Sequence, residues 1–513
     1  MAQQDNPTCG SHEDKGVLIG QANGGDRTQY NEAWLIKVDS TLKVPEKMWR
    51  VSKNVCIYRV PQAIIFSKPE DYKPSVVSLG PYHHNINPQF SKMDQHKLQA
   101  VHRVSTRLKI DVPTLIAEFE KLELEIRECY EEPIELNGKS LSRMLAMDAC
   151  FILEFCRNSA VSRSESNSDF FSLIFQRDDL KNSMFYAILD DLIKLENQIP
   201  LFVILKLLEL EEGGTREYAA TELATMLSKR SLFRGNPFFK FSHQHALPKL
   251  KEHMMGERPA YHLLDLCRKM VKDTLTNSTG KPATCVENDG YRGANNISND
   301  NGWSMNAVLP GWVQRVSCID ILPRVSPLLS PDDRRATPSA ELLYGAGIRF
   351  QPGKIKFEKR RFGSRTLDLP SVTITDNTES RLRNLMAYEE CQRCSWYPEP
   401  TVVSHFVILF DYLVDSEKDV ALLRKSRVIR RMVGCDENIA RMFNRIRVGI
   451  TFSGIGQIEE VMVKARNHYK SQWKVWMSQF KEEHFSKPWY ILSLVAAILI
   501  LGMTAIQTVY SVD

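Results

Sequence analysis

An uncharged segment of twenty residues near the C-terminus most constrains what this chain can be. It runs from Ile491 to Tyr510 with the sequence ILSLVAAILILGMTAIQTVY. A helix rises 1.5 Å per residue, so a segment of this length crosses a hydrocarbon core of ~30 Å. Trp489 and Tyr490 precede the segment, and aromatic rings favour the level of the lipid headgroups. The sequence therefore predicts one C-terminal transmembrane helix, with residues 485–513 as a membrane anchor.

The charges beside this segment predict its orientation. Basic residues lie only on its N-terminal side, at Lys464, Arg466, Lys470, Lys474, Lys481 and Lys487. The positive-inside rule then places the body in the cytosol, at the plasma membrane or another endomembrane. The polar stretch 1–27 lacks the apolar core of a signal peptide, which agrees with that placement.

Two alternatives to this topology stay open. In the first, the body lies outside the cytosol, and Asn277-Ser278-Thr279 and Asn296-Ile297-Ser298 are glycosylation acceptors. In the second, residues 491–510 form a buried core helix, since helices that are apolar all round also occur at the centres of large cores.

Composition indicates a globular body without a strong charge preference. Of the 513 residues, 43% are hydrophobic and 25% are charged, which is ordinary for a folded protein. A net charge of +5 is weak for this length and does not favour a nucleic-acid partner. Basic clusters at 354–365 and 424–431 are typical of solvated faces, with contact to anionic lipid as the alternative.

The eleven cysteines form no recognisable framework. Cys129, Cys150 and Cys156 lie in apolar helical patterns, where we expect them to be buried as small hydrophobic residues. Cys391 and Cys394 form a Cys-x-x-Cys pair, but neither a second pair nor histidines follow at zinc-ligand spacing. We therefore expect no metal site and no cofactor.

The chain divides into three parts by composition. Residues 1–30 are polar and predicted to be disordered, residues 31–484 form the globular body, and residues 485–513 form the anchor. Within the body, residues 275–316 read as a long polar loop or disordered insert. Apolar periodicity and caps predict a helix that begins at Ser91, and helices at about 31–50, 113–126, 141–157, 184–210, 217–232, 258–275, 379–392, 402–414, 417–430, 437–447 and 458–483.

A small β element is predicted near residues 345–375. Residues 348–350 and 355–357 alternate in hydrophobicity on either side of Pro352-Gly353, which indicates a hairpin. Residues 366–369 and 372–374 could add strands. The predicted fold class is α+β, predominantly α-helical, with this small β element and one C-terminal transmembrane helix.

Histidines are the first candidates for chemistry. The set near residue 90 comprises His83, His84, Asp94, His96 and His102. His96 and His102 are six residues apart, whereas ligands on one helix face lie three or four apart. We expect His83 and His84 to bind backbone groups of a turn. His243, His245 and His253 are predicted to lie in a loop.

The polar run Glu196-Asn197-Gln198 inside an apolar helix is the second candidate. Pro200 should kink the predicted helix 184–210 and leave carbonyl groups unpaired. We expect the three side chains to bind those carbonyls, with a pocket lining as the alternative.

Two buried carboxylates also need partners. Asp148 and Glu154 lie in the apolar helix 141–157, and Arg127 or Arg143 could supply the opposite charge.

Several catalytic signatures are absent from the sequence. It contains no phosphate-binding Gly-x-x-x-x-Gly-Lys-Ser/Thr loop, no dinucleotide-binding Gly-x-Gly-x-x-Gly after a strand, no His-Glu-x-x-His and no Gly-x-Ser-x-Gly. No catalytic, cofactor-binding or metal-binding residue is therefore assigned.

Taken together, many segments resemble one family, the plant DUF247 proteins, also called UPF0481. The segments are CIYRVP (56–61), YKPSVVSLGPYHH (72–84), MDQHK (93–97), IRECY (126–130), MDACFILEF (147–155), DLIKLENQIPLF (191–202), TPSAELLYGAGIRF (337–350), TESRLRNLMAYE (378–389), VDSEKDVALL (414–423) and 487–510. The resemblance covers about residue 50 to the C-terminus. Asn85 and Asp94 depart from the usual glycine and glutamate.

The resemblance implies a plant protein, usually with one C-terminal span and no established catalytic activity. Some grass members are associated with pollen–stigma self-incompatibility, which implies a recognition role, and the body is commonly drawn outside the cell. Our first hypothesis is a single-pass, non-catalytic recognition protein with a protein partner and an open oligomeric state.

Two further hypotheses belong to other classes. One is an enzyme of unrecognised type with a pocket around His83, His84 and Glu196, which requires these side chains to lie within ~10 Å of one another. The other is a docking scaffold for lipid headgroups.

Overall fold

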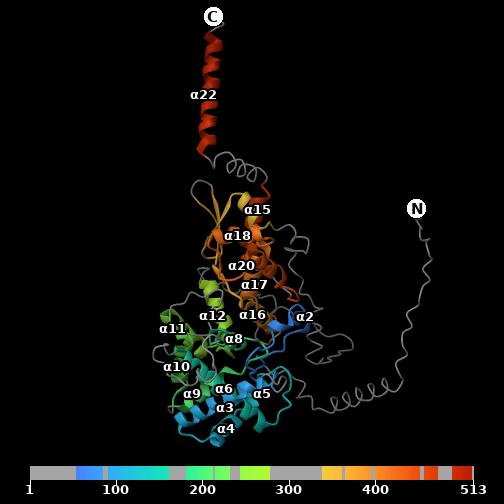
Figure 1. Cartoon of the computed structure of the whole chain (residues 1–513), viewed down its shortest axis with the longest axis vertical. Coiled ribbons are helices and arrows are strands. Elements are labelled where there is room, and N and C mark those ends of the chain that lie inside the picture. The colour runs from blue at the N-terminus through green and yellow to red at the C-terminus, as the bar shows by residue number, and fades with distance from the viewer. Residues whose placement is uncertain are drawn as a thin grey trace, which may run out of the picture. The chain divides into compact units, whose positions relative to one another are not determined.

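Helices dominate the computed structural model of this chain, and a small β element accompanies them (Figure 1). The structure describes residues 54–84, 90–160, 181–211, 214–230, 243–277, 338–360, 364–393, 395, 399–450, 456–471 and 488–510. All of them belong to one of the two units of the chain, residues 52–306 together with 315–513.

The helices before the polar insert are α2 (Gln62–Ile65), the 3₁₀ turn η2 (Pro69–Asp71), α3 (Ser91–Leu108), α4 (Val112–Glu120), α5 (Glu123–Glu128), α6 (Gly138–Ala160), α8 (Lys181–Asp191), α9 (Leu201–Glu211), α10 (Arg216–Arg230), α11 (His243–Met255) and α12 (Leu263–Asn277). Those after it are α15 (Ala340–Gly345), α16 (Thr378–Arg393), α17 (Val402–Leu413), α18 (Glu417–Lys425), α19 (Asp436–Arg445), α20 (Gly456–Tyr469) and α22 (Pro488–Tyr510). The strands are β1 (Ile348–Pro352), β2 (Lys356–Lys359), β3 (Arg365–Leu369), β4 (Val372–Ile374) and β5 (Ile429–Arg431).

Helix α6 is the centre of the N-terminal helices. It contacts α3, α4, α9 and α10, which surround it in Figure 1. Its residues 148–156 are all buried, because a helix with neighbours on several sides has no face left for solvent. Phe155 lies in this stretch with 1% of its surface exposed and stacks on Phe185 at 5.3 Å between ring centroids.

Helix α16 is the corresponding central helix of the C-terminal elements. It packs against α12 and α17, and α17 in turn contacts α19 and α20. Like α6, it buries charged residues, including Arg381, Arg383 and Glu389. Each needs a partner of opposite polarity, because an unpaired buried charge is strongly destabilising.

The strands confirm a small β element but not the predicted hairpin. β1 and β2 do not pair with each other, because β3 lies between them in the order β1-β3-β2. β1 runs parallel to β3, with Phe350 opposite Leu367, and β2 runs antiparallel to it. β4 forms a second, parallel pair with β5, a strand from more than fifty residues further along the chain that local patterning did not reveal.

Most predicted helices are present, with four informative differences. The predicted helix 113–126 is two helices, α4 and α5. The predicted helix 417–430 is too long, since α18 ends at Lys425 and residues 429–431 form β5. The predicted helix 184–210 is two helices, since α8 ends at Asp191 and α9 begins at Leu201. Residues 243–255, predicted as loop, form α11. Ser416 and Asp419, whose spacing in the sequence is typical of a helix start, form a capping box with both reciprocal hydrogen bonds at the start of α18.

The C-terminal helix requires a correction. α22 covers the predicted segment, but among the residues that the structure describes no helix is long and apolar enough to cross a membrane. This finding contradicts the predicted transmembrane anchor, and the predicted membrane location and orientation lose their support with it.

Several predictions concern residues outside the described ranges. These are the disordered segment 1–30, the helix at 31–50, most of the insert 275–316, Cys394, and the part of the predicted helix 458–483 beyond Ser471. In the part that is described, α20 buries Met462 and Ala465 against the body.

Replacing Phe155 should cost much more stability than replacing an exposed phenylalanine. Phe155→Ala removes a ring from the packing around α6 and should lower the free energy of unfolding by about 3–5 kcal/mol. Phe66→Ala, at a side chain 89% exposed, is the matched control and should change it by less than about 0.5 kcal/mol. Urea unfolding followed by circular dichroism measures both, and equal losses would contradict the central position of α6.

Candidate functional site: the polar connection between α8 and α9

Glu196 and His83, distant in sequence, meet in the structure. His83 Nε2 lies 3.3 Å from Glu196 Oε2, and both side chains are about nine-tenths buried. Arg59 Nη1 donates to the same oxygen at 3.1 Å, and the backbone N–H of Val60 donates to Oε1 at 2.9 Å. The distance condition of the enzyme hypothesis is therefore met for His83 and Glu196.

The charge state of Glu196 follows from these contacts. Burial alone would raise its pKa, but the neighbouring imidazole of His83, the hydrogen bond from the Val60 N–H and the charge of Arg59 outweigh it and lower the pKa of Glu196. An ionised carboxylate whose two oxygens already accept hydrogen bonds holds its donors in place and has no proton to give. Arg59 is fixed further by the ring of Tyr82, 4.0 Å from its guanidinium carbon, and by Glu132 at 2.9 Å.

Asp191 binds the backbone of a distant loop. Its carboxylate accepts hydrogen bonds from the backbone N–H groups of Ser75, Val76 and Val77 at 2.8, 2.6 and 2.9 Å. Burial raises the pKa of Asp191 even though these amides favour the charged form. The sequence analysis did not single out Asp191. It lies at the end of an apolar helix, where a buried carboxylate requires hydrogen-bond partners.

Asn197 and Gln198 also bind backbone groups. Asn197 accepts from the Leu79 N–H at 2.7 Å and donates to the Val77 carbonyl at 3.0 Å. Gln198 donates to the carbonyls of Leu192 and Lys194, at 2.9 and 2.7 Å. These carbonyls belong to the end of α8 and the turn after it, so the predicted role is confirmed in kind, but no continuous kinked helix supplies the acceptors.

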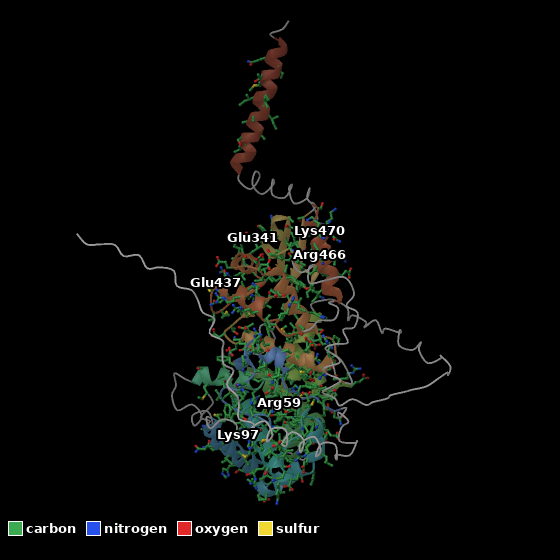
Figure 2. The ribbon with its side chains drawn as sticks, turned by 90° about the vertical axis from the view of Figure 1, so that its right-hand side faces the viewer. Arg59, Lys97, Glu341, Glu437, Arg466 and Lys470 are labelled. Atoms are coloured by element: carbon green, nitrogen blue, oxygen red, sulfur yellow. The ribbon has the colours of Figure 1, made fainter. Side chains whose placement is uncertain are left out.

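Asp148 completes the binding of the loop at 75–80. It accepts from the Gly80 N–H at 2.8 Å and pairs with Lys97 at 2.7 Å, and Lys97 also donates to the Ser78 carbonyl at 2.5 Å (Figure 2 labels Arg59 and Lys97). The prediction of an Arg127 or Arg143 partner is wrong, because α3 brings Lys97 to α6 whereas Arg127 binds Glu123 and nearby carbonyls.

Glu154 likewise pairs with an unpredicted residue. Its partner is Arg107, also from α3. Both carboxylates of α6 are therefore neutralised from one neighbouring helix, and only the packing of α3 on α6 could show this.

The same connection reaches the C-terminal elements through α16. Asn384 accepts from the Leu195 N–H at 2.9 Å and donates to the Asp71 carbonyl at 2.8 Å. Lys194 donates to that same carbonyl at 2.8 Å, and burial lowers the pKa of Lys194. Residues 191–198 thus join the N-terminal loop, α6 and α16 at one place, which we call the polar hub.

A second cluster of buried charge joins α12 to the start of α17. Arg268, 1% exposed, pairs with Asp265 at 3.1 Å and with Glu399 at 2.5 Å. Lys269 and Lys272 both lie 3.5 Å from Glu399. Burial would raise the pKa of Glu399, but these three positive charges lower it to about 2.

The remaining candidate histidines do not join the hub. His96 contacts Gln99 on its own helix at 3.3 Å, and His102 is exposed. His253 pairs with Asp273 of α12 at 3.0 Å, a contact that the sequence pattern did not reveal. Within the described ranges, no group of three or more His, Cys, Asp or Glu side chains is arranged to hold a metal ion.

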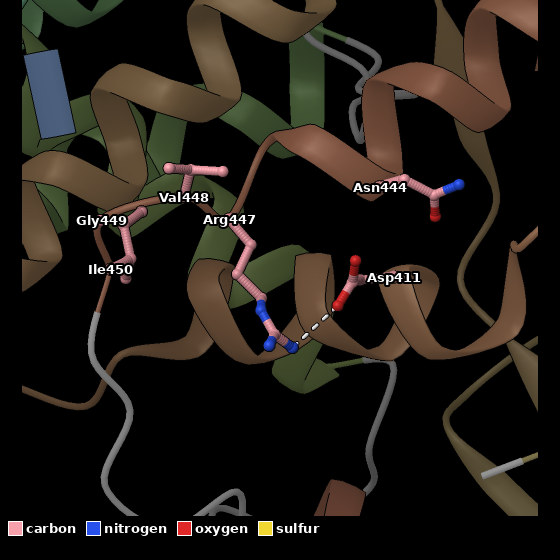
Figure 3. A pocket seen from close by; sticks show the side chains of 6 residues that line it. All are labelled: Asp411, Asn444, Arg447, Val448, Gly449 and Ile450. Atoms are coloured by element: carbon pink, nitrogen blue, oxygen red, sulfur yellow. Dashed lines mark hydrogen bonds and ion pairs between the residues drawn. The ribbon is translucent and has the colours of Figure 1, made fainter. Parts of the chain in front are cut away.

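A pocket of about 370 Å³ lies away from the hub (Figure 3). Asp411, Asn444, Arg447, Val448, Gly449 and Ile450 line it. Arg447 and Asp411 bind each other at 2.8 Å across it, and Asn444 donates to the Asp415 carbonyl at 3.1 Å. The two charged side chains of the lining, Arg447 and Asp411, therefore bind each other.

The polar hub therefore has a structural chemistry. Side chains of Asp191, Asn197 and Asp148 accept five backbone N–H groups of the loop at 75–80. A buried amide without an acceptor costs about 1–3 kcal/mol, so this pairing is what allows the loop to be buried.

Comparisons with known proteins agree with the resemblance seen in the sequence. Residues 57–503 match DUF247, a family described as a plant protein of unknown function. A putative UPF0481 protein of Arabidopsis thaliana is 26% identical, over 92% of this chain and 93% of its own. A second UPF0481 protein of the same plant is 25% identical, over 90% of this chain and 87% of its own. No solved structure matches the chain significantly.

Gly80→Ala should be more destabilising than the same change at another glycine with positive φ. Gly80 has φ +67°, and a Cβ there would lie 2.6 Å from the Gln198 carbonyl oxygen. Gly434 has φ +80° but open space around it. We expect a loss of about 2–4 kcal/mol for Gly80→Ala and about 1 kcal/mol for Gly434→Ala, from urea unfolding curves. Similar losses would show that the loop does not approach the hub this closely.

Acid should weaken the fold through Glu399. Its folded pKa lies below the unfolded value, so the ionised carboxylate stabilises the fold above the unfolded pKa, ~4.3, and this contribution is lost as the pH falls toward 2. Glu399→Gln should flatten the fall of the free energy of unfolding between pH 4.5 and 2. Glu437→Gln, at an exposed pair with Arg441, is the control and should leave that slope unchanged. Identical slopes for both variants and the parent would refute this role.

Proposed function

We propose that this chain, which belongs to the DUF247 family of plant proteins of unknown function, is a protein-binding module that recognises an acidic segment of its partner. The proposed contact surface is the segment from Arg424 to Val433, which we call the basic turn. The observation that carries the proposal is its run of five basic side chains beside the exposed Met432 and Val433.

The basic turn concentrates positive charge beside apolar side chains. Its sequence is RKSRVIRRMV, without an acidic residue. The positive side chains are Arg424, Lys425, Arg427, Arg430 and Arg431, all of them exposed except the partly buried Arg430. Met432 and Val433 are 70% and 45% exposed. Arginine and methionine are enriched where proteins bind each other, and exposed apolar side chains beside charge favour a protein partner over a purely ionic one.

The backbone of the turn holds an arginine in an unfavourable conformation. Arg427 has φ 61°, at the end of α18, where its N–H binds the Arg424 carbonyl and the Val428 N–H binds the Leu423 carbonyl. Glycine is the usual residue at this position, and a side chain there costs about 1–2 kcal/mol. A residue that destabilises its own helix end is a candidate for a role outside folding.

The turn is also held ready for contact. Asp436 at the start of α19 pairs with Arg424 at 2.9 Å and with Arg431 at 3.2 Å. These two exposed pairs add little stability, but they orient the guanidinium groups on one side of the turn. A preorganised set of guanidinium groups suits the carboxylates of an acidic segment, which Arg binds in bidentate fashion.

Selection of random peptides displayed on phage against the whole chain tests this function. We expect the enriched peptides to carry Asp or Glu beside apolar residues. Synthetic copies should bind Arg427→Glu at least tenfold more weakly than the parent, because one attractive charge becomes repulsive.

Lys109→Glu is the matched control. Lys109 is exposed, ends α3 with φ 54°, and undergoes the same charge reversal away from the basic turn. It should bind the peptides as the parent does. Enriched peptides without acidic residues, or equal weakening by both variants, would refute the proposal.

A further inference from the structure

We infer that Cys56 and Cys129 are a disulfide site, joined when the chain folds in contact with a small-molecule disulfide such as oxidised glutathione. This inference is independent of the basic turn. It rests on the backbone pairing of residues 56–57 with residues 129–131, which follow α5.

The backbone places the two cysteines side by side. The Cys129 carbonyl accepts the N–H groups of both Cys56 and Ile57 at 2.9 Å. One residue further along, Ile57 and Tyr130 form a parallel β-bridge, and the Glu131 N–H donates to the Ile57 carbonyl at 3.0 Å. Neighbouring strands lie about 4.8 Å apart, which is within the Cα separation of about 4.4–6.8 Å that a disulfide requires.

The two side chains also meet. Both are buried, with 1% and 6% of their surface exposed. Burial, and after it the neighbouring Cys129 thiol, raises the pKa of Cys56. The Cys129 thiol donates to the Glu125 carbonyl at 3.3 Å, so its side chain must leave this hydrogen bond before the two sulfurs can join.

The surroundings decide when the bond can form. A thiolate is the attacking species, and the buried Cys56 thiol of the folded chain is held protonated. The site is enclosed by buried residues: His262 Nε2 lies 3.0 Å from the Cys56 carbonyl oxygen, and Tyr130, next to Cys129, is 4% exposed. The exchange consequently belongs to the unfolded or partly folded chain, in which both thiols reach solvent.

The exchange is balanced with one molecule of oxidised glutathione. The thiolate of one cysteine attacks a glutathione sulfur, forms a mixed disulfide and releases one glutathione thiolate. The thiolate of the other cysteine attacks the protein sulfur of the mixed disulfide and releases the second. Two protein thiols are oxidised, and one glutathione disulfide is reduced to two thiols.

The bond would constrain a long loop. It closes the segment from residue 56 to residue 129, which contains α2 to α5, and long loops give the largest stabilisation from a cross-link in the chain-entropy description. The N-terminal loop of the polar hub lies inside this segment. A covalent link here therefore favours the arrangement that the hub holds by hydrogen bonds.

Refolding of the full-length chain tests the site. Reduced, denatured protein is refolded in a buffer of oxidised and reduced glutathione, remaining thiols are alkylated, and tryptic peptides are analysed by mass spectrometry without reduction. We expect peptide 54–59 linked to peptide 128–139, and a melting temperature about 5 °C above that of the reduced protein. The same buffer added to folded, reduced protein should give at least tenfold less of the linked pair.

Variants separate this pair from the other buried cysteines. Cys129→Ala should abolish the linked peptide and the gain in melting temperature, whereas Cys156→Ala, at another buried cysteine, should keep both. Alkylated Cys56 and Cys129 after oxidative refolding of the parent, or either cysteine linked elsewhere, would overturn the inference. Because that result needs no variant, the test holds even if Cys129→Ala fails to fold.

Discussion

The fold depends on a buried loop that cannot satisfy its own backbone. Residues 75–80 form neither helix nor strand, yet Val77 and Leu79 are almost fully buried. Their amides have no ladder to join, so acceptors must come from side chains. Asp191 and Asn197 supply them from the connection between α8 and α9, and Asp148 supplies another from α6. If these acceptors were lost, the apolar residues of the loop could be buried only with unpaired amides beside them.

This requirement explains why charged residues lie in the core at all. Asp148 is useful to the loop only as a carboxylate, and Lys97 makes that charge tolerable while it also binds the Ser78 carbonyl. Buried ion pairs are weak contributors to stability as such, because desolvation offsets most of their attraction. Their value here is positional, since each pair fixes one segment of backbone against another.

The hub also separates the structural residues from those available for binding. His83 and Glu196 belonged to the candidate pocket of the enzyme hypothesis, but the contacts of Glu196 with His83, Arg59 and the Val60 amide hold the N-terminal loop in place. The basic turn differs in kind. Arg427 has a strained backbone and the side chain of Met432 is 70% exposed, while their backbone groups bind Arg424, Ser371 and Ile374.

Local sequence determined the helices, the capping box at Ser416 and Asp419 and the family, because periodicity, caps and motifs act over a few neighbouring residues. It also marked Glu196 to Gln198 as unusual. Tertiary structure alone decided the partners, such as Lys97 for Asp148, and the place of β3 between β1 and β2. It likewise contradicted the membrane span that the apolar segment at 491–510 predicted. Hydrogen bonds and ion pairs between residues a hundred positions apart depend on how helices pack, and no local pattern encodes that.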